Sequence, residues 1–483
     1  MLTSNKKKVI KTVIILLILY VIYLILGATL PFIFHKEVSD SAKESLEVSR
    51  FYGDGVSVDR AAVVEDSDEA LDIRLRMLNE AKEKIIMSSF SFKTDRASQE
   101  IFATVLAAAD RGVKVEIIAD GLSAGIDMER DPMYYVLAAH DNITIKYYNM
   151  LNLMKPWTAN GRLHDKYVII DDRMLILGGR NTSNYFLGTY NTKVLSYDRD
   201  IFVYNTAAET DRSEESVIHE VEEYFYTLWN YKDSEIVFDS VPLSRKKKIA
   251  PAKQMLEETY QNLLAERPDI MEDEFDYMDY TVPTNKITLI TNPITIMSKE
   301  PYIWYQINEL MQNAKDRVII QTPYVVLSKA MENDLKKLKG KLRQYDMLIN
   351  SIEVGDNYMA SSDYLFNKQD VLDTGATVYE FAGKYSMHNK SVLIDNDISI
   401  IGSYNFDMRS VYLDTETMLV VHGEEFNKEL ENAMNVMKEQ SYEVDSSGEY
   451  VAGEDVALPE LPWWKKIAFR VTSVVFQVIR YLL

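Results

Sequence analysis

Hydrophobic and polar residues follow three distinct patterns along this chain. From Thr12 to Phe34, an uncharged and almost wholly apolar run is long enough to cross a bilayer as a helix. Near the other end, polar residues recur between 466 and 480 at steps of 4, 3, 4 and 3, which predicts a helix with one polar stripe. Between these ends, short runs rich in Val and Ile alternate with longer segments of helical spacing. This alternation predicts an α/β fold whose sheets are covered by helices.

The N-terminal apolar run favours a retained membrane anchor. A cleaved signal peptide has a shorter apolar stretch of about 7–15 residues and a small-residue cleavage site, whereas this run continues through bulky residues at 30–32. Four basic residues precede the run, namely Lys6, Lys7, Lys8 and Lys11. Because acidic residues follow it, the positive-inside rule predicts a single-pass protein of the cell membrane. Its N-terminus would be cytoplasmic and its main body extracytoplasmic.

The C-terminal segment opens with Trp463 and Trp464 and carries Arg470 and Arg480 in its polar stripe. Two arginines argue against a bilayer span, whereas paired tryptophans and a dominant apolar face suit a helix lying in the membrane interface. A terminal helix docked on the protein's own core would show the same periodicity. Both interpretations stay open at this point.

Two halves of the chain resemble each other and predict two homologous domains. Three pairs of segments correspond in order: 74–92 with 307–326, 112–121 with 343–351, and 142–149 with 375–381. A repeat of this size indicates duplicated domains and not a solenoid of short units. The stretch between the halves carries charge runs that are typical of a solvated linker or insertion.

The predicted organisation therefore has six parts. They are a basic start and transmembrane anchor (1–36), a juxtamembrane linker (37–59), a first domain (60–232), a linker or insertion (233–283), a second domain (284–445), and a hinge with an amphipathic helix (446–483).

The strongest chemical signal is a histidine motif that occurs twice. HDKYVIID (164–171) and HNKSVLID (388–395) share one layout and are separated by 388 − 164 = 224 residues. In a strand, residues i and i+2 point to one face, so His164 would project with Lys166, and His388 with Lys390. A duplicated domain could preserve a packing histidine, but burying His beside Lys without an anion would be costly. The pattern therefore predicts a phosphate site.

Two histidines in different protonation states suit transfer at phosphorus. A neutral imidazole attacks phosphorus while a protonated one gives its proton to the departing alcohol oxygen, a scheme that requires no metal or other cofactor. Asn181 and Asn405 follow the two motifs at the same offset and, with the lysines, could stabilise the non-bridging oxygens. Asp200 and Glu416, on the strand predicted after each motif, are the candidates to orient the histidines.

The two motifs, together with GGRN and GSYN downstream, resemble the paired HKD motifs of the phospholipase D superfamily. The resemblance covers about 60–445 and implies two phospholipase D-like α/β/α lobes with pseudo-two-fold symmetry and the site at their interface. Finer features are similar to bacterial cardiolipin synthases of the C type. These features are IIADGLSAG, LNLMKPWTANGRLHDK, NSIEVGDNYMASSDY and ELPWWKK.

The resemblance also implies roles for the motif residues. His164 would be the nucleophile that forms a phosphatidyl-histidine intermediate, and His388 the general acid and then the base for the incoming alcohol. The phosphate oxygens would be held by Lys166, Lys390, Asn181 and Asn405. Asp171 and Asp395 complete the two catalytic motifs. Their odd spacing from the histidines puts them on the opposite strand face, where we expect structural supports and not acids.

Composition narrows the class of substrate. The formal net charge of −21 disfavours a nucleic-acid partner, because so acidic a body repels phosphate backbones. The absence of cysteine excludes disulfides, thiolate metal sites and cysteine nucleophiles. An apolar cluster precedes His164 and is predicted either as a lip for acyl chains or as an ordinary loop packed on its own domain. Its members are Tyr147, Tyr148, Leu151, Leu153, Met154, Pro156 and Trp157.

The favoured reaction is phosphatidyl transfer between membrane phospholipids. It would make cardiolipin from phosphatidylglycerol and a phospholipid donor such as phosphatidylethanolamine. Three alternatives stay open: a phospholipase D that hydrolyses lipids to phosphatidic acid, an HKD-type phosphodiesterase or nuclease, and a non-catalytic lipid-binding scaffold.

Overall fold

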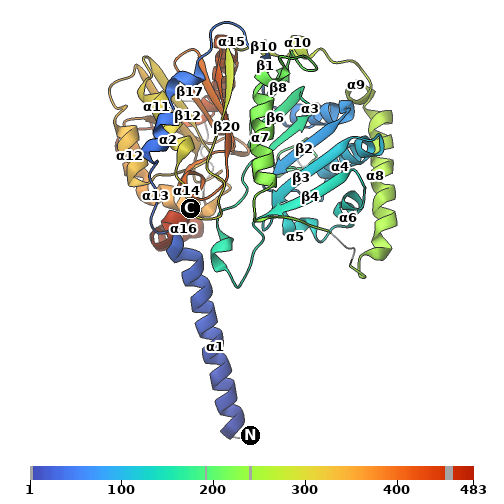
Figure 1. The fold of residues 1–483 in the computed structure, drawn as a ribbon. Helices are drawn as coiled ribbons and strands as arrows, with labels where there is room; N and C mark the ends of the chain where they lie inside the picture. Colours follow the sequence, from blue (N-terminus) through green and yellow to red (C-terminus); the bar gives the residue numbers. More distant parts are fainter. Residues whose placement is uncertain (1–3, 191–192, 239–241, 452–460) are drawn as a thin grey trace.

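The fold consists of two α/β lobes beside each other and one long helix that projects from them (Figure 1). It is seen in a computed structural model that describes residues 4–190, 193–238, 242–451 and 461–483. The projecting helix is α1 (Ser4–Thr29), and residues Lys6–Phe32 are long and apolar enough to cross a membrane. The span lies slightly earlier than the predicted Thr12–Phe34, because the helix already begins at Ser4 and includes the lysine cluster.

The first lobe contains a nine-stranded sheet in the order β10-β1-β8-β6-β5-β2-β3-β4-β9. Its strands are β1 (Asp59–Val64), β2 (Lys84–Ser89), β3 (Lys114–Asp120), β4 (Ile143–Tyr148), β5 (Tyr167–Ile170), β6 (Met174–Gly178), β8 (Asp200–Asn205), β9 (Ser234–Ile236) and β10 (Val282–Pro283). The central strands are buried on both faces, as their Val- and Ile-rich runs predict.

The second lobe contains an eight-stranded sheet in the order β11-β20-β18-β17-β12-β14-β15-β21. Its strands are β11 (Lys286–Thr291), β12 (Arg317–Gln321), β14 (Gln344–Asn350), β15 (Thr377–Phe381), β17 (Ser391–Ile394), β18 (Ile398–Gly402), β20 (Thr417–His422) and β21 (Ser441–Val444).

The two sheets repeat one topology. From β1 and β11 onward, corresponding strands occupy the same places, and every neighbouring pair has the same parallel or antiparallel sense in both sheets. Only β10 is additional among the described strands of the first sheet. The predicted fold of two homologous α/β lobes is therefore confirmed.

Helices cover both faces of each sheet, and the lobes share a core. The outer faces are covered by α3 (Ser67–Glu80) and α4 (Arg96–Asp110) in the first lobe and by α11 (Tyr302–Gln312) and α13 (Tyr358–Leu372) in the second. Between the sheets lie α7 (Val217–Trp229) and α15 (Glu424–Lys438), and α7 contacts β11 while α15 contacts β1. One apolar cluster joins Ile169 of β5 to Leu393 of β17, so the lobes pack as one body.

The segment predicted as a linker or insertion (233–283) is largely helical. It contains α8 (Lys246–Glu266), α9 (Pro268–Met271) and α10 (Tyr277–Tyr280). Leu256 and Leu263 of α8 are buried against α4, so this helix is an added layer of the first lobe. The charge run at its start is exposed, as expected of a solvated face.

The predicted hinge falls partly on residues 452–460, which lie outside the described part of the chain. After it come α16 (Trp463–Phe476) and a 3₁₀ turn, η5 (Gln477–Leu482). They pack against α13 at the foot of the second lobe, near the point where α1 leaves the body (Figure 1).

Candidate active site

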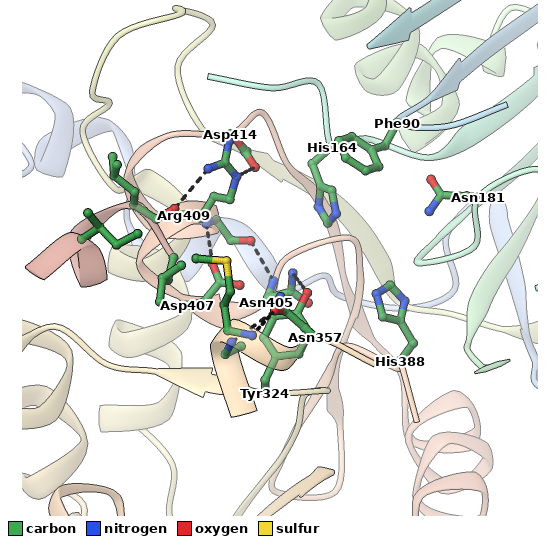
Figure 2. A pocket seen from close by; sticks show the side chains of 16 residues that line it. Phe90, His164, Asn181, Tyr324, Asn357, His388, Asn405, Asp407, Arg409 and Asp414 are labelled. Carbon is green, nitrogen blue, oxygen red and sulfur yellow. Dashed lines mark hydrogen bonds and ion pairs between the residues drawn. The ribbon is translucent and has the colours of Figure 1, made fainter. Parts of the chain in front are cut away.

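The two motif histidines lie in one cavity between the lobes. His164 and His388 stand three residues before β5 and β17, and both line a cavity of about 500 Å³ (Figure 2). Asn181 and Asn405, which follow β6 and β18, line the same cavity. The structure thus brings together four of the predicted residues, two from each lobe.

Short parallel pairings between the lobes set the position of each histidine. Met387 pairs with Tyr197 between β16 (Ser386–Met387) and β7 (Ser196–Tyr197), which places His388 beside Asp198. An isolated bridge between Leu163 and Thr415 places His164 beside Glu416 in the same way.

A carboxylate of the opposite lobe binds each histidine. The Nδ1 atom of His164 lies 2.8 Å from Oε1 of Glu416, and that of His388 lies 2.6 Å from Oδ2 of Asp198. Both carboxylates are completely buried. A hydrogen bond from Nδ1 to a carboxylate leaves Nε2 of each imidazole for a substrate.

The prediction for Asp200 is wrong. This carboxylate lies 2.8 Å from Arg74 and 3.1 Å from Arg180, and both guanidinium groups are buried with it. It therefore neutralises two arginines inside the first lobe and orients no histidine. The physical reason is the position of each residue along the chain, since Asp200 begins β8 inside the first lobe, whereas Asp198 directly follows β7, whose pairing with β16 brings it to His388.

The register of the sheets contains the signal that identifies Asp198. Gly178 pairs with Asp200 in the first sheet and Gly402 pairs with Met418 in the second. Two residues before each partner stand Asp198 and Glu416. If the two halves are aligned through Gly178 and Gly402, Asp198 corresponds to Glu416 and is identified as the partner of His388. Choosing the first acidic residue of β8 selects Asp200 instead.

The motif lysines lie directly behind the histidines. Lys166 donates a hydrogen bond to the His164 carbonyl oxygen at 2.6 Å, and Lys390 donates to the His388 carbonyl oxygen. Burial lowers the pKa of both ammonium groups, that of Lys166 to about 7. Their charges adjoin the cavity without forming its surface, which the two asparagines and two histidines provide.

The motif aspartates lie away from the cavity. Asp171 accepts hydrogen bonds from the backbone amides of residues 82–84, and Asp395 accepts them from residues 315–317. Both have positive φ angles, 53° and 48°, at the tight turn that ends each motif strand. Their carboxylates hold the loops that precede β2 and β12, and neither faces a histidine.

The two histidine–carboxylate pairs differ electrostatically. Burial and the neighbouring Lys166 hold the pKa of His164 well below its usual value. Burial also raises the pKa of Glu416 to about 8, although Lys166 and two serine hydroxyls oppose the shift. At the other pair, Lys390 and His388 overcome burial and lower the pKa of Asp198 to about 2. Burial and Lys390 lower the pKa of His388, but the Asp198 charge opposes them.

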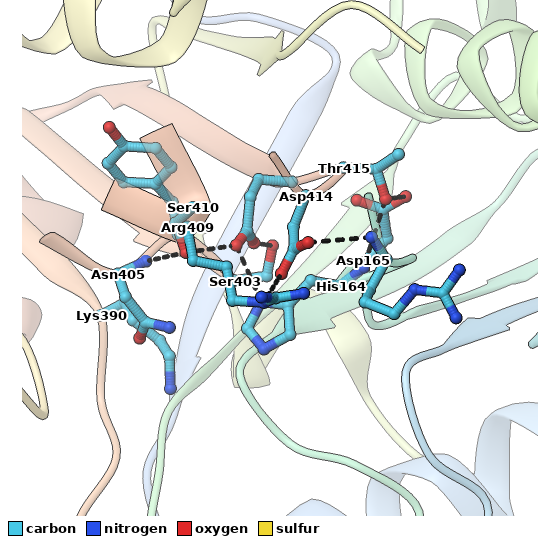
Figure 3. A network of polar contacts seen from close by, with 12 residues as sticks. His164, Asp165, Lys390, Ser403, Asn405, Arg409, Ser410, Asp414 and Thr415 are labelled. Atoms are coloured by element: carbon cyan, nitrogen blue, oxygen red, sulfur yellow. Dashed lines mark hydrogen bonds and ion pairs between the residues drawn. The ribbon is translucent and has the colours of Figure 1, made fainter. Parts of the chain in front are cut away.

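A buried polar network that includes Ser403, Ser410 and Thr415 lies beside His164 (Figure 3), and its serine hydroxyls hold Glu416 in place. The Ser410 hydroxyl donates to Glu416 Oε1 at 2.6 Å, and the Ser403 hydroxyl donates to Oε2. Beside it, Thr415 donates to Asp165 at 3.1 Å. These contacts fix the carboxyl plane and hence the orientation of the His164 ring.

The rest of the cavity wall was not predicted from the sequence. One side carries polar groups of the second lobe, namely Tyr324, Asn357, Asp407, Arg409 and Asp414 (Figure 2). The lining also contains apolar residues, namely Met359, Ala360, Ile479, Leu482 and Leu483. A cavity with both kinds of wall suits an amphiphile that carries a phosphate.

The apolar cluster before His164 divides in the structure. Tyr147 and Tyr148 are buried in β4 and belong to the core. Leu151, Leu153 and Met154 are exposed on a loop that runs beside α1, where the 3₁₀ turn η3 (Pro156–Ala159) contacts the helix. The loop is therefore apolar at its tip and lies against the membrane-span candidate, not over the histidines.

A family model and two named relatives agree on the family to which this chain is similar. The family model described as "Cardiolipin synthase, PLD-like domain" matches residues 74–229 and 307–438. Cardiolipin synthase C of Escherichia coli is 22% identical over 399 residues, covering 75% of this chain and 81% of that protein. Cardiolipin synthase B of Escherichia coli is 21% identical over 406 residues, covering 83% of this chain and 84% of that protein. The resemblance to the C type is thus matched by one of similar strength to the B type.

Two further likenesses complete the comparison. An uncharacterized protein of Helicobacter pylori is 26% identical over 416 residues, covering 79% of this chain and 80% of that protein. The crystal structure of the phosphatidylserine synthase of Haemophilus influenzae superimposes with a TM-score of 0.62 at 15% identity, covering 88% of this chain and 95% of that one. At this identity the structural likeness shows the fold.

Proposed function

This chain belongs to the cardiolipin synthase family with phospholipase D-like domains, and we propose that it is a phosphatidyltransferase that makes cardiolipin from phosphatidylglycerol and a phospholipid donor. The observation that carries the proposal is the pair of histidines in one cavity, each bound through Nδ1 to a buried carboxylate of the other lobe. Both Nε2 atoms are left for one phosphodiester, as double displacement at phosphorus requires.

The electrostatic difference between the two pairs supports the assignment of roles. His164 is held neutral by burial and Lys166, so its Nε2 lone pair is available to attack phosphorus. His388 faces Asp198, which stays ionised and opposes the lowering of the His388 pKa by burial and Lys390, so His388 takes up the proton that a general acid needs more readily than His164. The sequence could assign these roles only by resemblance, whereas the surroundings of the two rings supply a physical reason.

The proposed reaction has two balanced steps. In the first, Nε2 of His164 bonds to phosphorus, the bond from phosphorus to the headgroup oxygen breaks, and His388 gives that oxygen its proton. In the second, His388 takes the proton of the hydroxyl of phosphatidylglycerol, the new P–O bond forms, and the P–N bond breaks. Asn181 and Asn405 face the phosphate, and Lys166 and Lys390 supply positive charge behind it.

The membrane-span candidate supports a lipid substrate. We infer a single-pass protein whose lysine-rich N-terminus is cytoplasmic and whose lobes are extracytoplasmic. The loop before His164 donates no side chain to the cavity but is bound to the helix, because the Tyr20 and Tyr23 hydroxyls donate to the carbonyl oxygens of Leu153 and Met154 at 3.2 and 2.7 Å. The catalytic cavity is thereby held close to the lipid headgroups.

A lipid product assay tests the proposal. Purified full-length protein is incubated with vesicles of phosphatidylglycerol and phosphatidylethanolamine in the presence of a chelator, beside the His164→Ala and His388→Ala variants. His140→Ala serves as the matched control, because His140 is partly buried beside Asp110 and does not line the cavity. We expect cardiolipin from the wild type and the control only.

Other products would support the alternatives. Phosphatidic acid as the main product would make the protein a phospholipase D that uses water as acceptor. No lipid turnover, with cleavage of a simple phosphodiester or of DNA, would make it an HKD-type phosphodiesterase or nuclease. Wild-type cellular function in the His164→Ala variant would favour a lipid-binding scaffold.

A further inference from the structure

The C-terminal helix α16 binds the protein through its polar side chains. Gln477 and Arg480, which continue its polar stripe into η5, lie 2.9 and 2.8 Å from Oδ1 of Asp363, a fully buried carboxylate of α13. The Thr472 hydroxyl lies 3.1 Å from that of Ser362. Ser473 is buried as well, so the C-terminal part of the stripe faces the protein, whereas Arg470 stays exposed.

Most of the apolar side chains of α16 point outward as a result, although Phe469 is buried against Tyr358. The exposed residues include Trp464, Ile467, Val471, Val474 and Val475 of α16 and Val478 at the start of η5. Val475, for example, keeps 57% of its surface exposed. In water such an orientation is unfavourable, because it buries the groups that water solvates well and exposes those that it does not. At a bilayer interface the same orientation is favourable, because the outward apolar side chains meet lipid and the polar side chains are turned away from it.

The position of α16 indicates that a lipid surface covers this face. The turn η5 lies beside the segment that follows the membrane-span candidate, where Tyr481 contributes a backbone hydrogen bond to His35 and the His35 ring stacks on Tyr412 at 4.0 Å. In Figure 1, α16 lies across the end of α1. Lys465 and Arg470 are exposed beside the apolar face, as is typical of helices that lie among lipid headgroups.

The turn η5 also forms part of the catalytic cavity. The backbone amide of Arg409 donates to the Leu483 carbonyl oxygen at 2.7 Å, and its guanidinium donates to that of Leu482 at 3.1 Å. These bonds hold the side chains of Ile479, Leu482 and Leu483 against the cavity. One continuous segment therefore runs from an outward apolar face to the apolar wall of the active site.

We propose that α16 and η5 form one lipid-docking element. Its outward face lies in the membrane interface, and its last turn is the wall along which the acyl chains run in a phospholipid whose phosphate is between the histidines. The wall also keeps water from the phosphate, which favours a lipid alcohol as acceptor. The acyl-wall part rests on the proposed function, whereas the docking part does not.

Single-site labelling tests the docking part. Because the chain has no cysteine, Val475→Cys can carry one environment-sensitive fluorophore, and Val436→Cys, at an exposed valine of α15, is the matched control. After reconstitution of the full chain into vesicles, we expect nitroxide lipids to quench the label at position 475 and not the one at 436. Equal quenching at both positions, or a label at 475 that is shielded already in detergent, would overturn docking on lipid. The second result would indicate a protein contact.

Acyl-length dependence tests the wall. The Leu482→Ala/Leu483→Ala variant is compared with wild type and Val436→Ala on phosphatidylglycerol with short and with long acyl chains. We expect the ratio of kcat/KM for long over short chains to fall about tenfold in the double variant, since it loses apolar contact, and to stay unchanged in Val436→Ala. An unchanged ratio in the double variant would overturn the wall. If the wild type turns over neither lipid, the proposed function and the wall fail together, and the quenching result still decides docking.

Discussion

The Nδ1 atom of His388 lies 2.6 Å from Oδ2 of Asp198, although the two residues belong to different lobes. The mirror relationship joins His164 to Glu416. Each histidine thus receives its orientation from the lobe that does not carry it, so neither lobe alone contains a complete site. The apolar core shared by the two lobes fixes their relative position. It therefore fixes both histidine–carboxylate pairs at once.

Replacing Asp198 with Asn should shift the pH dependence of the reaction. The ionised Asp198 raises the pKa of His388 against burial and Lys390, so without that charge the pKa of His388 falls further. A general acid works only while it is protonated, so the alkaline limb of the pH profile of kcat/KM should move to lower pH. Near neutral pH we expect a loss of about a hundredfold.

The measurement is the pH profile of cardiolipin formation by the wild type and Asp198→Asn. Asp198 itself does not titrate in the accessible range, because its pKa lies at about 2. Glu416→Gln is the informative comparison, since burial raises the pKa of that carboxyl to about 8 and its charge is less firmly held. If the alkaline limb of the pH profile moved further toward low pH in Glu416→Gln than in Asp198→Asn, the result would contradict the assignment of His388 as the acid.

Removing the carboxylate of Asp200 should destabilise the first lobe and leave the pH profile in place. Asp200→Ala leaves Arg74 and Arg180 buried without a counter-charge, which typically lowers the free energy of unfolding by about 3–5 kcal/mol. Chemical denaturation in detergent measures this loss, with exposed Asp54→Ala as the control. An Asp200→Ala protein of wild-type stability and shifted pH profile would restore the original interpretation of Asp200 as a histidine partner.

The sequence predicted the repeated parts of the molecule and missed the parts that join them. The two homologous α/β lobes and the paired motif histidines follow from local periodicity and from the internal repeat. Asp198 was missed because contact between lobes depends on strand register, which a single strand pattern does not specify. The inverted orientation of α16 was missed for a similar reason, since periodicity identifies a polar stripe but not whether Asp363 or water meets it.

A substrate with an acidic leaving group should separate the roles of the two histidines. p-Nitrophenolate departs without a proton, so a phosphatidyl ester of p-nitrophenol needs His164 for attack but not His388 for departure. In His388→Ala we expect one equivalent of p-nitrophenolate per protein followed by a stall, because the base for the second step is missing. Mass spectrometry should then find an acid-labile phosphatidyl group on His164.

The reciprocal variant is the control for that experiment. His164→Ala should release no burst, because no nucleophile remains in the cavity. A burst from His164→Ala together with none from His388→Ala would exchange the two roles. It would also contradict the argument that the low pKa of His164 makes this residue the nucleophile.

The tip of the loop before His164 should lie within the hydrocarbon of the bilayer. Tyr23, which binds the Met154 carbonyl oxygen, stands 32 − 23 = 9 residues before the end of the membrane-span candidate at Phe32. At 1.5 Å per residue this places the contact about 13 Å along the helix from that end. Met154 is 72% exposed there, and an apolar side chain gains from lipid contact. A fluorophore on Met154→Cys should therefore be quenched by nitroxides on acyl chains, unlike one on exposed Val56→Cys. Quenching of Met154→Cys by headgroup nitroxides alone would place the loop at the surface and contradict insertion.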